Sequence, residues 1–500
     1  MAQRYNILFG GPAGSGPNIL THILGEALVK MGYYVFYSRD YQSLIRGGHN
    51  FNVLTFSEEP VNSNDSQMDI LVAFDENTEN LHRKELKKNG VLLNGDKENM
   101  YFAGRIFKLL CIEFKVLDNI LKELGKKYDE NIKEAKQGYE DEKKNVCKIF
   151  PKKEGLYFVN GNQGIANGAI ESGLNVYIAY PMTPSTSVLN ELAEKAEEKN
   201  MTVLELENEL AVANAGMGSA ATGAITMVGS SGGGIDLMTE AMSMTGMAEI
   251  PLVFFLAQRP GPGTGVATYN SQGDLHMARH AGHGEFQRVV LAPGDPKESF
   301  ELTNQAFYFS QKYKIPSIIV SDKHLGESFY TLKEKGKAVQ VVKSTVFGRY
   351  NSYEKNNVNF SATEDAAITK ENFERRMKKI PMITKDAKNF SRYEIYGDKK
   401  SKNVIVSWGS TKGAIIDAIA TIKCKFLHIK YIEPFPEEVE KELKGKNILL
   451  IENSSTGMLG DVIREKTGIL IDNKNKILRY DGRPFLADEL NKEINKRFKK

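Results

Sequence analysis

Three residues of different chemistry follow predicted strands in the middle of the chain: Thr183, Glu209 and Arg259. Thr183 lies in a Tyr-Pro-Met-Thr-Pro-Ser-Thr turn after the apolar run Leu174–Ala179, and Arg259 follows the apolar run Pro251–Ala257. Such runs are typical of parallel strands that are buried on both faces. Because ligands of open α/β sheets bind at the carboxyl ends of the strands, we expect the three side chains to meet at one edge. Together they predict a site for an anionic substrate and for a cofactor that accepts a proton.

The residues after Glu209 predict a helix of small side chains, because alanine, glycine and serine occupy most positions from 211 to 223. Such a helix lets another backbone or a flat ligand approach closely. It is followed by the loop Gly229–Gly234, of sequence Gly-Ser-Ser-Gly-Gly-Gly, whose backbone amides can cradle a ligand. Ser231 and Gly232 in this loop are therefore candidate cofactor-binding residues.

Each of these residues also has a purely structural explanation. The hydroxyls and prolines of the first turn are common at helix starts, and a carboxylate there complements the helix dipole. Arg259 can anchor its loop. Glu207 competes with Glu209, because positions two apart share one face of an extended segment. Periodicity therefore leaves the choice between Glu207 and Glu209 open.

A glycine-rich loop also follows the first predicted strand. The order is strand Tyr5–Phe9, the loop Gly10-Gly-Pro-Ala-Gly-Ser-Gly, and a helix from about Ile19 to Met31. This arrangement is the general device for holding a phosphate at a helix N-terminus, although the glycine spacing is not the dinucleotide fingerprint. Gly14, Ser15 and Gly16 are the candidate residues, with tight turn packing as the alternative.

Arg46 precedes two glycines after a second strand at Tyr34–Tyr37. A guanidinium in such a loop suits a phosphate contact, and a structural ion pair is the alternative.

Composition and patterning predict a soluble α/β protein of several domains. The 500 residues are 41% hydrophobic and carry a net charge of +3, which implies no nucleic-acid partner. Alternating strands and helices predict a domain at 1–150, a doubly wound domain at 155–332, a charged linker at 333–402 and a smaller α/β domain at 403–500.

The three cysteines lie far apart and form no CxxC pair. They argue for a reducing cytoplasm, and against a disulfide framework or an iron–sulfur cluster held by this chain. The first residues contain no apolar signal core, and no apolar run reaches the length of a membrane span. We therefore expect a cytoplasmic protein without a membrane partner.

The central motifs resemble the fused γ–α subunit of the 2-oxoacid:ferredoxin oxidoreductases, a family that includes 2-oxoglutarate synthase. The resemblance covers nearly the whole chain, and it departs from the family pattern at Gly263, in the loop at 231–234 and at Gln287. The following segments carry it: the turn at 180–186, Glu207-Asn-Glu209, Met238-Thr-Glu-Ala241, Met247-Ala-Glu-Ile-Pro251, Gln258-Arg-Pro-Gly-Pro262, Gly282-His-Gly-Glu-Phe286, Leu291-Ala-Pro-Gly-Asp295 and Ser321–Ser328.

This resemblance implies a central domain of the thiamine-diphosphate pyrimidine-binding type, a γ-like first domain near coenzyme A, and a transketolase-like C-terminal domain. Decarboxylation of a 2-oxoacid leaves a carbanion, and thiamine diphosphate supplies the electron sink. Alignment with the family favours Glu209 as the carboxylate that bonds the pyrimidine nitrogen. Arg259 and Thr183 would bind the substrate, while Gly14, Ser15, Gly16 and Arg46 would contact coenzyme A.

The chain lacks the Gly-Asp-Gly segment that introduces the diphosphate and magnesium site of thiamine enzymes. It therefore predicts no metal site of its own and only the pyrimidine half of a thiamine site. The family supplies the remainder: a β subunit with magnesium, the diphosphate pocket and a [4Fe–4S] cluster, with ferredoxin as the acceptor and an (αβ)2 assembly.

The resemblance predicts the conversion of a 2-oxoacid and coenzyme A to acyl-CoA, CO2 and reduced ferredoxin, with 2-oxoglutarate or a broad range of acids as the substrate. Two alternatives stay open. One is a two-subunit thiamine-dependent decarboxylase without electron transfer, for which a coenzyme A module would have no use. The other is a non-catalytic scaffold subunit.

Overall fold

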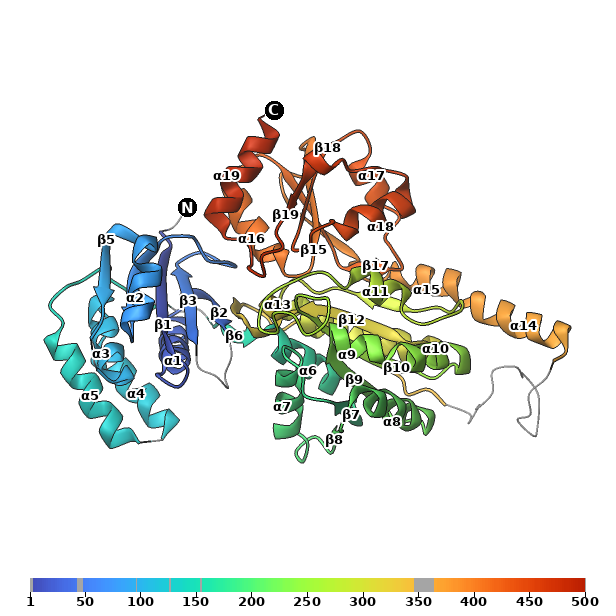
Figure 1. Ribbon diagram of the computed structural model, residues 1–500, viewed down its shortest axis with the longest axis horizontal. Coiled ribbons are helices and arrows are strands. Elements are labelled where there is room, and N and C mark those ends of the chain that lie inside the picture. The colour runs from blue at the N-terminus through green and yellow to red at the C-terminus, as the bar shows by residue number, and fades with distance from the viewer. Residues whose placement is uncertain are drawn as a thin grey trace.

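The computed structural model describes residues 3–42, 48–95, 97–125, 127–152, 155–345 and 364–499. It contains three β-sheets with helices packed against them, which confirms the predicted α/β class. Figure 1 shows the first part of the chain at the left in blue, the middle part in green and yellow, and the C-terminal part above it in orange and red.

The first sheet has the strand order β5-β4-β1-β3-β2-β13-β6. In β1, Ile7 and Phe9 face the core beneath α1, while Leu8 faces the opposite side, as strand alternation requires. The elements of the first part are β1 (Tyr5–Pro12), α1 (Pro17–Lys30), β2 (Tyr34–Tyr41), β3 (His49–Ser57), β4 (Met68–Ala73), α2 (Glu76–His82), η1 (Arg83–Glu85), β5 (Leu86–Leu93), α3 (Asn99–Leu109), α4 (Phe114–Leu124) and α5 (Tyr128–Asp141).

Helix α5 of the first part is tightly packed, although most of its residues are polar. Helix α5 crosses α3 at two glycines, Gly138 and Gly104. A Cβ atom on either glycine would lie 1.9 Å from a backbone carbonyl oxygen of the other helix. The two helices therefore approach as closely as their backbones allow.

The second sheet has the order β17-β11-β12-β10-β9-β7-β8. All neighbouring pairs from β11 to β8 are parallel, and β9, β10 and β12 are buried along their whole length. Its elements are β7 (Val176–Ala179), α7 (Thr186–Glu194), β8 (Thr202–Glu205), α8 (Glu209–Ala221), β9 (Thr226–Ser231), α9 (Gly232–Leu237), α10 (Thr239–Ala248), β10 (Leu252–Gln258), α11 (Leu275–His280), β11 (Val289–Leu291), α12 (Pro296–Tyr313), β12 (Ser317–Asp322) and β17 (Tyr431–Glu433).

Helices cover both faces of this sheet, as in a doubly wound domain. Ile178, Val228 and Phe254 pack on one face, whereas their neighbours Tyr177 and Phe255 pack on the other. Burial on both faces explains why the strands appear in the sequence as continuous apolar runs.

The third sheet has the order β14-β16-β15-β18-β19. Its part of the chain contains α14 (Ala366–Met377), α15 (Lys379–Ala387), β14 (Tyr393–Gly397), β15 (Asn403–Trp408), α16 (Thr411–Ala418), η2 (Ile419–Thr421), β16 (Lys425–Ile429), α17 (Val439–Leu443), β18 (Asn447–Glu452), α18 (Met458–Thr467), η3 (Asn473–Asn475), β19 (Lys476–Leu478) and α19 (Ala487–Phe498).

Sheet membership departs from the expected domain ranges in three places. The strands β6 (Tyr157–Asn160) and β13 (Phe329–Leu332), which flank α6 (Gly161–Glu171) and α13 (Lys323–Glu327), join the first sheet instead of the second. Strand β17 joins the second sheet, and β14 of the expected linker joins the third. A short strand between two domains pairs with the sheet edge that lies nearest to it. Its own sequence does not determine which sheet that is.

A buried charge network joins the middle part to the C-terminal part. The Lys412 ammonium donates to Glu298 Oε1 at 2.7 Å and also contacts Asp295. The second oxygen of Glu298 lies 3.0 Å from His428 Nε2 and accepts a hydrogen bond from the Gly294 amide at 2.7 Å. Because Glu298 and Lys412 are both buried, removal of either charge would leave the other without this partner in the interior, at a cost in stability.

Among the residues that the structure describes, no helix combines the length and the apolar character needed to cross a membrane.

Candidate active site

The predicted site residues meet at the carboxyl edge of the second sheet. The strands β10, β9, β7 and β8 are consecutive neighbours and parallel, so their carboxyl ends share one edge. Arg259 directly follows β10, Ser231 ends β9, and Thr183 and Glu209 follow β7 and β8 after short turns.

Arg259 and Thr183 are in direct contact. The Nη1 atom of Arg259 donates a hydrogen bond to the backbone carbonyl oxygen of Thr183 at 2.9 Å. Both residues are half-buried. The contact ties the end of β10 to the turn after β7 through the backbone of Thr183, so the Thr183 hydroxyl takes no part in this bond.

Glu209 is held in a narrow polar space at the start of α8. Its side chain is buried, and its Oε1 atom accepts a hydrogen bond from Ser230 Oγ at 3.3 Å. Gly234 faces the carboxylate so closely that a Cβ atom there would lie 2.6 Å from Oε1. A side chain at position 234 would therefore displace Glu209.

The structure distinguishes Glu207 from Glu209, which sequence periodicity could not do. Asn208 starts α8, and its side chain accepts a hydrogen bond from the Ala211 amide at 2.9 Å. The chain changes direction at this N-cap, so Glu207 is exposed whereas Glu209 is buried. Of the two, only Glu209 lies against the glycine loop.

Arg259 lies in the field of two carboxylates. Burial lowers the pKa of its guanidinium, and the negative charges of Glu209 and Asp274 oppose that shift. An arginine remains charged under such conditions, so the site contains a fixed cation beside the buried Glu209.

Ser231 and Gly232 lie where β9 ends and α9 begins, at the same sheet edge. The Ser231 hydroxyl is fully buried and has no hydrogen-bond partner among the described residues. Gly232 lies against Asp274, since a Cβ atom at position 232 would approach Asp274 Oδ2 to 2.5 Å. Buried polar atoms without partners mark positions where a ligand or water completes the hydrogen bonding.

Asp274 is a site residue that the sequence analysis missed. Burial, with the charge of Asp236 added, raises its pKa to about 6, and Arg259 opposes the shift. The residue follows Arg259 by fifteen positions and returns over the glycine loop. The sequence shows only an aspartate between Gly273 and Leu275, a pattern too common to indicate a site.

The first glycine loop turns into α1 as predicted. Gly14 and Gly16 adopt positive φ angles of 89° and 105°, which favour glycine, and Gly16 is the N-cap of α1. Ser15 Oγ donates to the Pro12 carbonyl oxygen at 2.8 Å, and Asn99 fills the space beside Gly16. The space around Gly14 is open. Arg46 lies outside the described residues.

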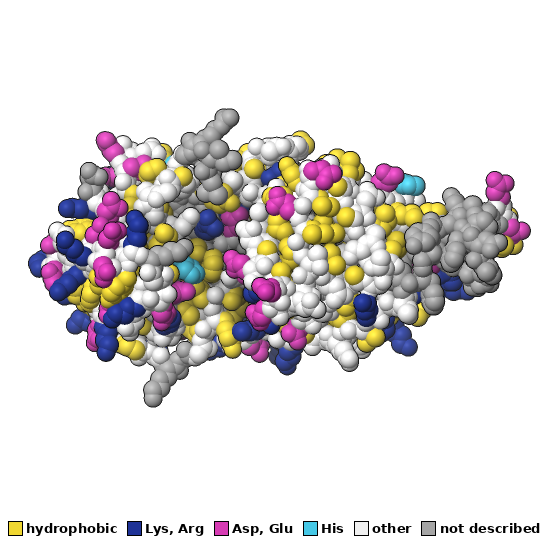
Figure 2. Space-filling model, turned by 90° about the horizontal axis from the view of Figure 1, so that it is seen from below, with side chains coloured by type: hydrophobic (Ala, Val, Ile, Leu, Met, Phe, Trp, Pro, Cys, Tyr) yellow, Lys and Arg dark blue, Asp and Glu magenta, His cyan; other side chains and the backbone are white. Residues whose placement is uncertain are grey.

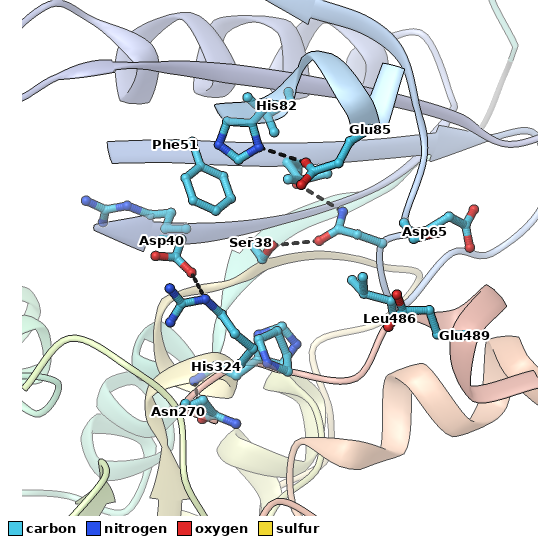
Figure 3. A pocket seen from close by; sticks show the side chains of 18 of the residues that line it. Ser38, Asp40, Phe51, Asp65, His82, Glu85, Asn270, His324, Leu486 and Glu489 are labelled. Atoms are coloured by element: carbon cyan, nitrogen blue, oxygen red, sulfur yellow. Dashed lines mark hydrogen bonds and ion pairs between the residues drawn. The ribbon is translucent and has the colours of Figure 1, made fainter. Parts of the chain in front are cut away.

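Two cavities lie beside this first part. One of about 590 Å³ is lined by Asn99 and by three glutamates and one lysine, so its charge does not favour a phosphate. Another, of about 530 Å³, lies where all three parts meet, and none of the predicted site residues line it. Figure 3 shows Ser38 and Phe51 on one side of it, with Asn270, His324 and Leu486 across the gap.

The acidic side chains of this second cavity are all paired. Each acidic side chain in its lining has a basic partner nearby: Asp40 with Arg483 at 3.0 Å, Asp65 with Arg4 at 3.0 Å, Glu85 with His82 at 2.7 Å and Glu489 with Arg479 at 3.5 Å. The lining also contains Arg39, Lys84 and Lys323, so its basic side chains outnumber its acidic ones.

Comparison with known proteins places two family profiles on the chain. Residues 6–99 match the pyruvate ferredoxin/flavodoxin oxidoreductase domain, and residues 167–392 match the thiamine-diphosphate-binding domain of pyruvate flavodoxin/ferredoxin oxidoreductase. The second match contains Thr183, Glu209, Arg259 and Asp274.

Full-length relatives agree with these domains. The chain is 28% identical to a 2-oxoacid:ferredoxin oxidoreductase subunit alpha from Sulfolobus sp., over 99% of this chain and 97% of that protein. It is also 28% identical to the subunit of that name from Saccharolobus solfataricus, over 98% and 97%.

A solved structure shares the fold. The 2-oxoglutarate:ferredoxin oxidoreductase from Magnetococcus marinus superposes with a TM-score of 0.87 and 22% identity, and the match covers 99% of each chain. The domains and the full-length relatives together confirm the resemblance carried by the sequence motifs: this chain belongs to the family of 2-oxoacid:ferredoxin oxidoreductase alpha subunits, and is therefore a subunit of an oxidoreductase.

Proposed function

We propose that this chain binds the 2-oxoacid and the pyrimidine half of thiamine diphosphate in an enzyme that converts a 2-oxoacid and coenzyme A to acyl-CoA, CO2 and reduced ferredoxin. The observation that supports this proposal most is the convergence of Arg259, Thr183 and Glu209 at one sheet edge. A fixed cation beside a buried carboxylate suits an anionic substrate next to a cofactor that exchanges protons.

The residues present fit thiamine diphosphate on its pyrimidine side. Glu209 would hold the ring through its carboxyl group, and the space beside Gly233 and Gly218 is open. Ser231 and Gly232 would line the same pocket, where the unpartnered Ser231 hydroxyl is available. When bound, the cofactor supplies the electron sink for decarboxylation.

The substrate would lie between Arg259 and Thr183, with its carboxylate on the guanidinium. We favour 2-oxoglutarate because several relatives are named 2-oxoglutarate synthase subunit KorA, among them one from Archaeoglobus fulgidus that is 29% identical over 62% of this chain and 90% of its own length. The similar structure from Magnetococcus marinus also has 2-oxoglutarate bound.

Replacement of Arg259 tests the substrate assignment. Removal of one partner from a desolvated charge pair costs roughly 2–5 kcal/mol, so Arg259→Ala should lower kcat/KM for the 2-oxoacid by about 1.5 to 3.5 decades. Arg259→Lys should recover only part of this loss, because lysine offers a point charge instead of a planar fork. Thr183→Val should cost about 1 kcal/mol.

Steady-state kinetics are measured beside proton exchange at the thiazolium carbon, which should stay nearly unchanged in these variants. If Arg259→Ala stops the exchange and leaves the affinity for 2-oxoacid intact, Arg259 serves the cofactor instead of the substrate.

Coenzyme A is the acyl acceptor in this proposal, as the similar structure with coenzyme A and succinyl-CoA bound suggests. The open face at Gly14 and the backbone amides before α1 remain the proposed phosphate contacts, together with Ser15, Gly16 and Arg46. The three glutamates that line the cavity next to Asn99 make that cavity an unfavourable place for these phosphates.

A partner subunit would complete the site. Apolar side chains that are 37 to 50% exposed stand on the elements that carry the site residues: Tyr180, Leu204, Leu210, Leu237 and Val266. Figure 2 shows hydrophobic side chains gathered over the middle of the face seen from below. A β subunit that covers this surface would contribute the diphosphate pocket with magnesium and a [4Fe–4S] cluster, and would pass electrons to ferredoxin in a cytoplasmic (αβ)2 assembly.

The isolated chain tests whether the cluster and the diphosphate pocket belong to the partner subunit. Purified without oxygen, it should show no stoichiometric iron–sulfur absorbance and no tightly bound thiamine diphosphate, and both should appear when the chain is purified with its partner. A stoichiometric cluster absorbance in the isolated chain would overturn the assignment of the cluster to a second subunit.

A further inference from the structure

Asp274 is anchored over the end of β10, next to Arg259. Its backbone amide donates to Gln258 Oε1 at 3.0 Å, and Gln258 Nε2 donates to the Ser321 carbonyl oxygen of β12 at 3.1 Å. Gln258 is fully buried, so these two hydrogen bonds fix the position of the Asp274 backbone relative to β10 and β12.

The carboxyl group of Asp274 does not serve the helix that it precedes. Asp274 is the N-cap residue of α11, but its side chain makes no capping hydrogen bond. The side chains of other N-cap residues, Asn208, Asp295 and Asp322, each accept such a bond from an amide of the following helix. An aspartate normally stabilises a helix in this way, so its orientation here has another cause.

The carboxyl group points toward Gly232 instead. Its Oδ2 atom is buried and has no hydrogen-bond partner in the described part of the chain, and the same holds for the hydroxyl of Ser231 next to Gly232. An unpaired buried polar atom costs free energy, so the unpartnered Oδ2 atom of Asp274 beside Gly232 indicates a position for a polar ligand group.

Charged groups surround this position. Arg259 faces Asp274 from the end of β10, and Asp236 faces it from α9. Glu209 of α8 is the second carboxylate that acts on Arg259. Burial raises the pKa of Asp274 to about 6, so the group is mostly ionised in the free site above neutral pH, and a further anion beside Arg259 would raise its pKa more.

We propose that Asp274 is a positioning residue that takes up one proton from water when a 2-oxoacid binds at Arg259, and then donates its O–H to an oxygen of that acid. The proton returns to water when the ligand leaves, so no other reactant is needed. This inference rests on the proposed function, because it requires the 2-oxoacid at Arg259.

Proton linkage determines the expected pH dependence. Below pH 6 the free site is already protonated and affinity is highest. Between about pH 6 and the higher pKa of the complex, the affinity should fall by up to about tenfold per pH unit, and proton uptake should approach one per site.

The experiment uses the complete enzyme with its partner subunit and thiamine diphosphate, and oxalylglycine as a non-reactive analogue of 2-oxoglutarate. Calorimetry at pH 7.5 in buffers of different ionisation enthalpy counts the protons taken up, and the dissociation constant is measured from about pH 5.5 to pH 8.5. The wild-type enzyme should bind the analogue with proton uptake and with affinity that falls as pH rises.

Three variants separate this role from a structural one. Asp274→Asn carries a permanent N–H donor, so it should keep the affinity of the low-pH form, with no proton uptake and a flat profile. Asp274→Ala should bind weakly at every pH. Asp236→Asn removes a repelling charge, so it should move the start of the affinity loss to lower pH.

The possible outcomes distinguish the two proposals. If proton uptake persists in Asp274→Asn, or if wild type binds the analogue without uptake, Asp274 does not carry the proton and this inference is wrong. If no 2-oxoacid analogue binds, the proposed function itself fails.

Discussion

Glu209→Gln is expected to slow proton exchange at the thiazolium carbon of bound thiamine diphosphate by about 10²–10⁴-fold, the usual cost of losing a partner in proton transfer. Glutamine keeps the size of the side chain and can still accept the hydrogen bond from Ser230, so the fold and the partner contact should persist. What it loses is the carboxyl group beside Gly234, which would bond the pyrimidine ring. Nuclear magnetic resonance of quenched samples measures the exchange rate.

Glu207→Gln is the matched control, because it makes the same chemical change two positions away on an exposed side chain. It should exchange at the wild-type rate. If Glu207→Gln shows the loss and Glu209→Gln does not, the pyrimidine contact is wrongly assigned.

Glu298→Ala is expected to lower the free energy of unfolding by about 3–5 kcal/mol, the typical cost of leaving one member of a buried charge network without its partner. The change removes the 2.7 Å contact to the buried Lys412 ammonium and the contact to His428, and leaves Lys412 with Asp295 alone. Urea unfolding, followed by the fluorescence of the buried Trp408 in the C-terminal part, measures the loss.

The pH dependence of unfolding provides a second measurement. Burial acts to raise the pKa of Glu298, but Lys412 and His428 outweigh it and hold the pKa well below its ordinary value. A lowered pKa in the folded state means that this stabilisation is present above the pKa of the unfolded chain and is lost as the pH falls through the folded value. Glu298→Ala should therefore be less sensitive to acid than wild type.

Glu334→Ala serves as the control for the charge network. Glu334 pairs with Lys297 on the surface, where solvent screens the interaction, so its removal should leave stability nearly unchanged. If Glu298→Ala changes the free energy of unfolding as little as Glu334→Ala does, Glu298 acts as an ordinary surface group.

The sequence alone was sufficient to predict the fold class and the sheet edge at which the candidate site residues meet. Apolar runs at Leu174–Ala179 and Pro251–Ala257 identify strands buried on both faces, and such strands are parallel and end at a common edge. Arg259 follows its strand directly and Thr183 follows its strand after a short turn, so their proximity depends on strand ends that share one edge. The first glycine loop was predictable for the same reason, since its strand and helix are consecutive in the chain.

The tertiary structure decided what depends on contacts between distant segments. The N-cap at Asn208 turns Glu207 outward and Glu209 inward, which strand periodicity could not show. Asp274 reaches Gly232 only because Gln258 holds its backbone over the end of β10. The strands β6 and β13 join the first sheet because that edge lies beside them in space. Local pattern determines whether a segment is a strand or a helix, whereas packing determines which partner it finds and which side chains are left without water.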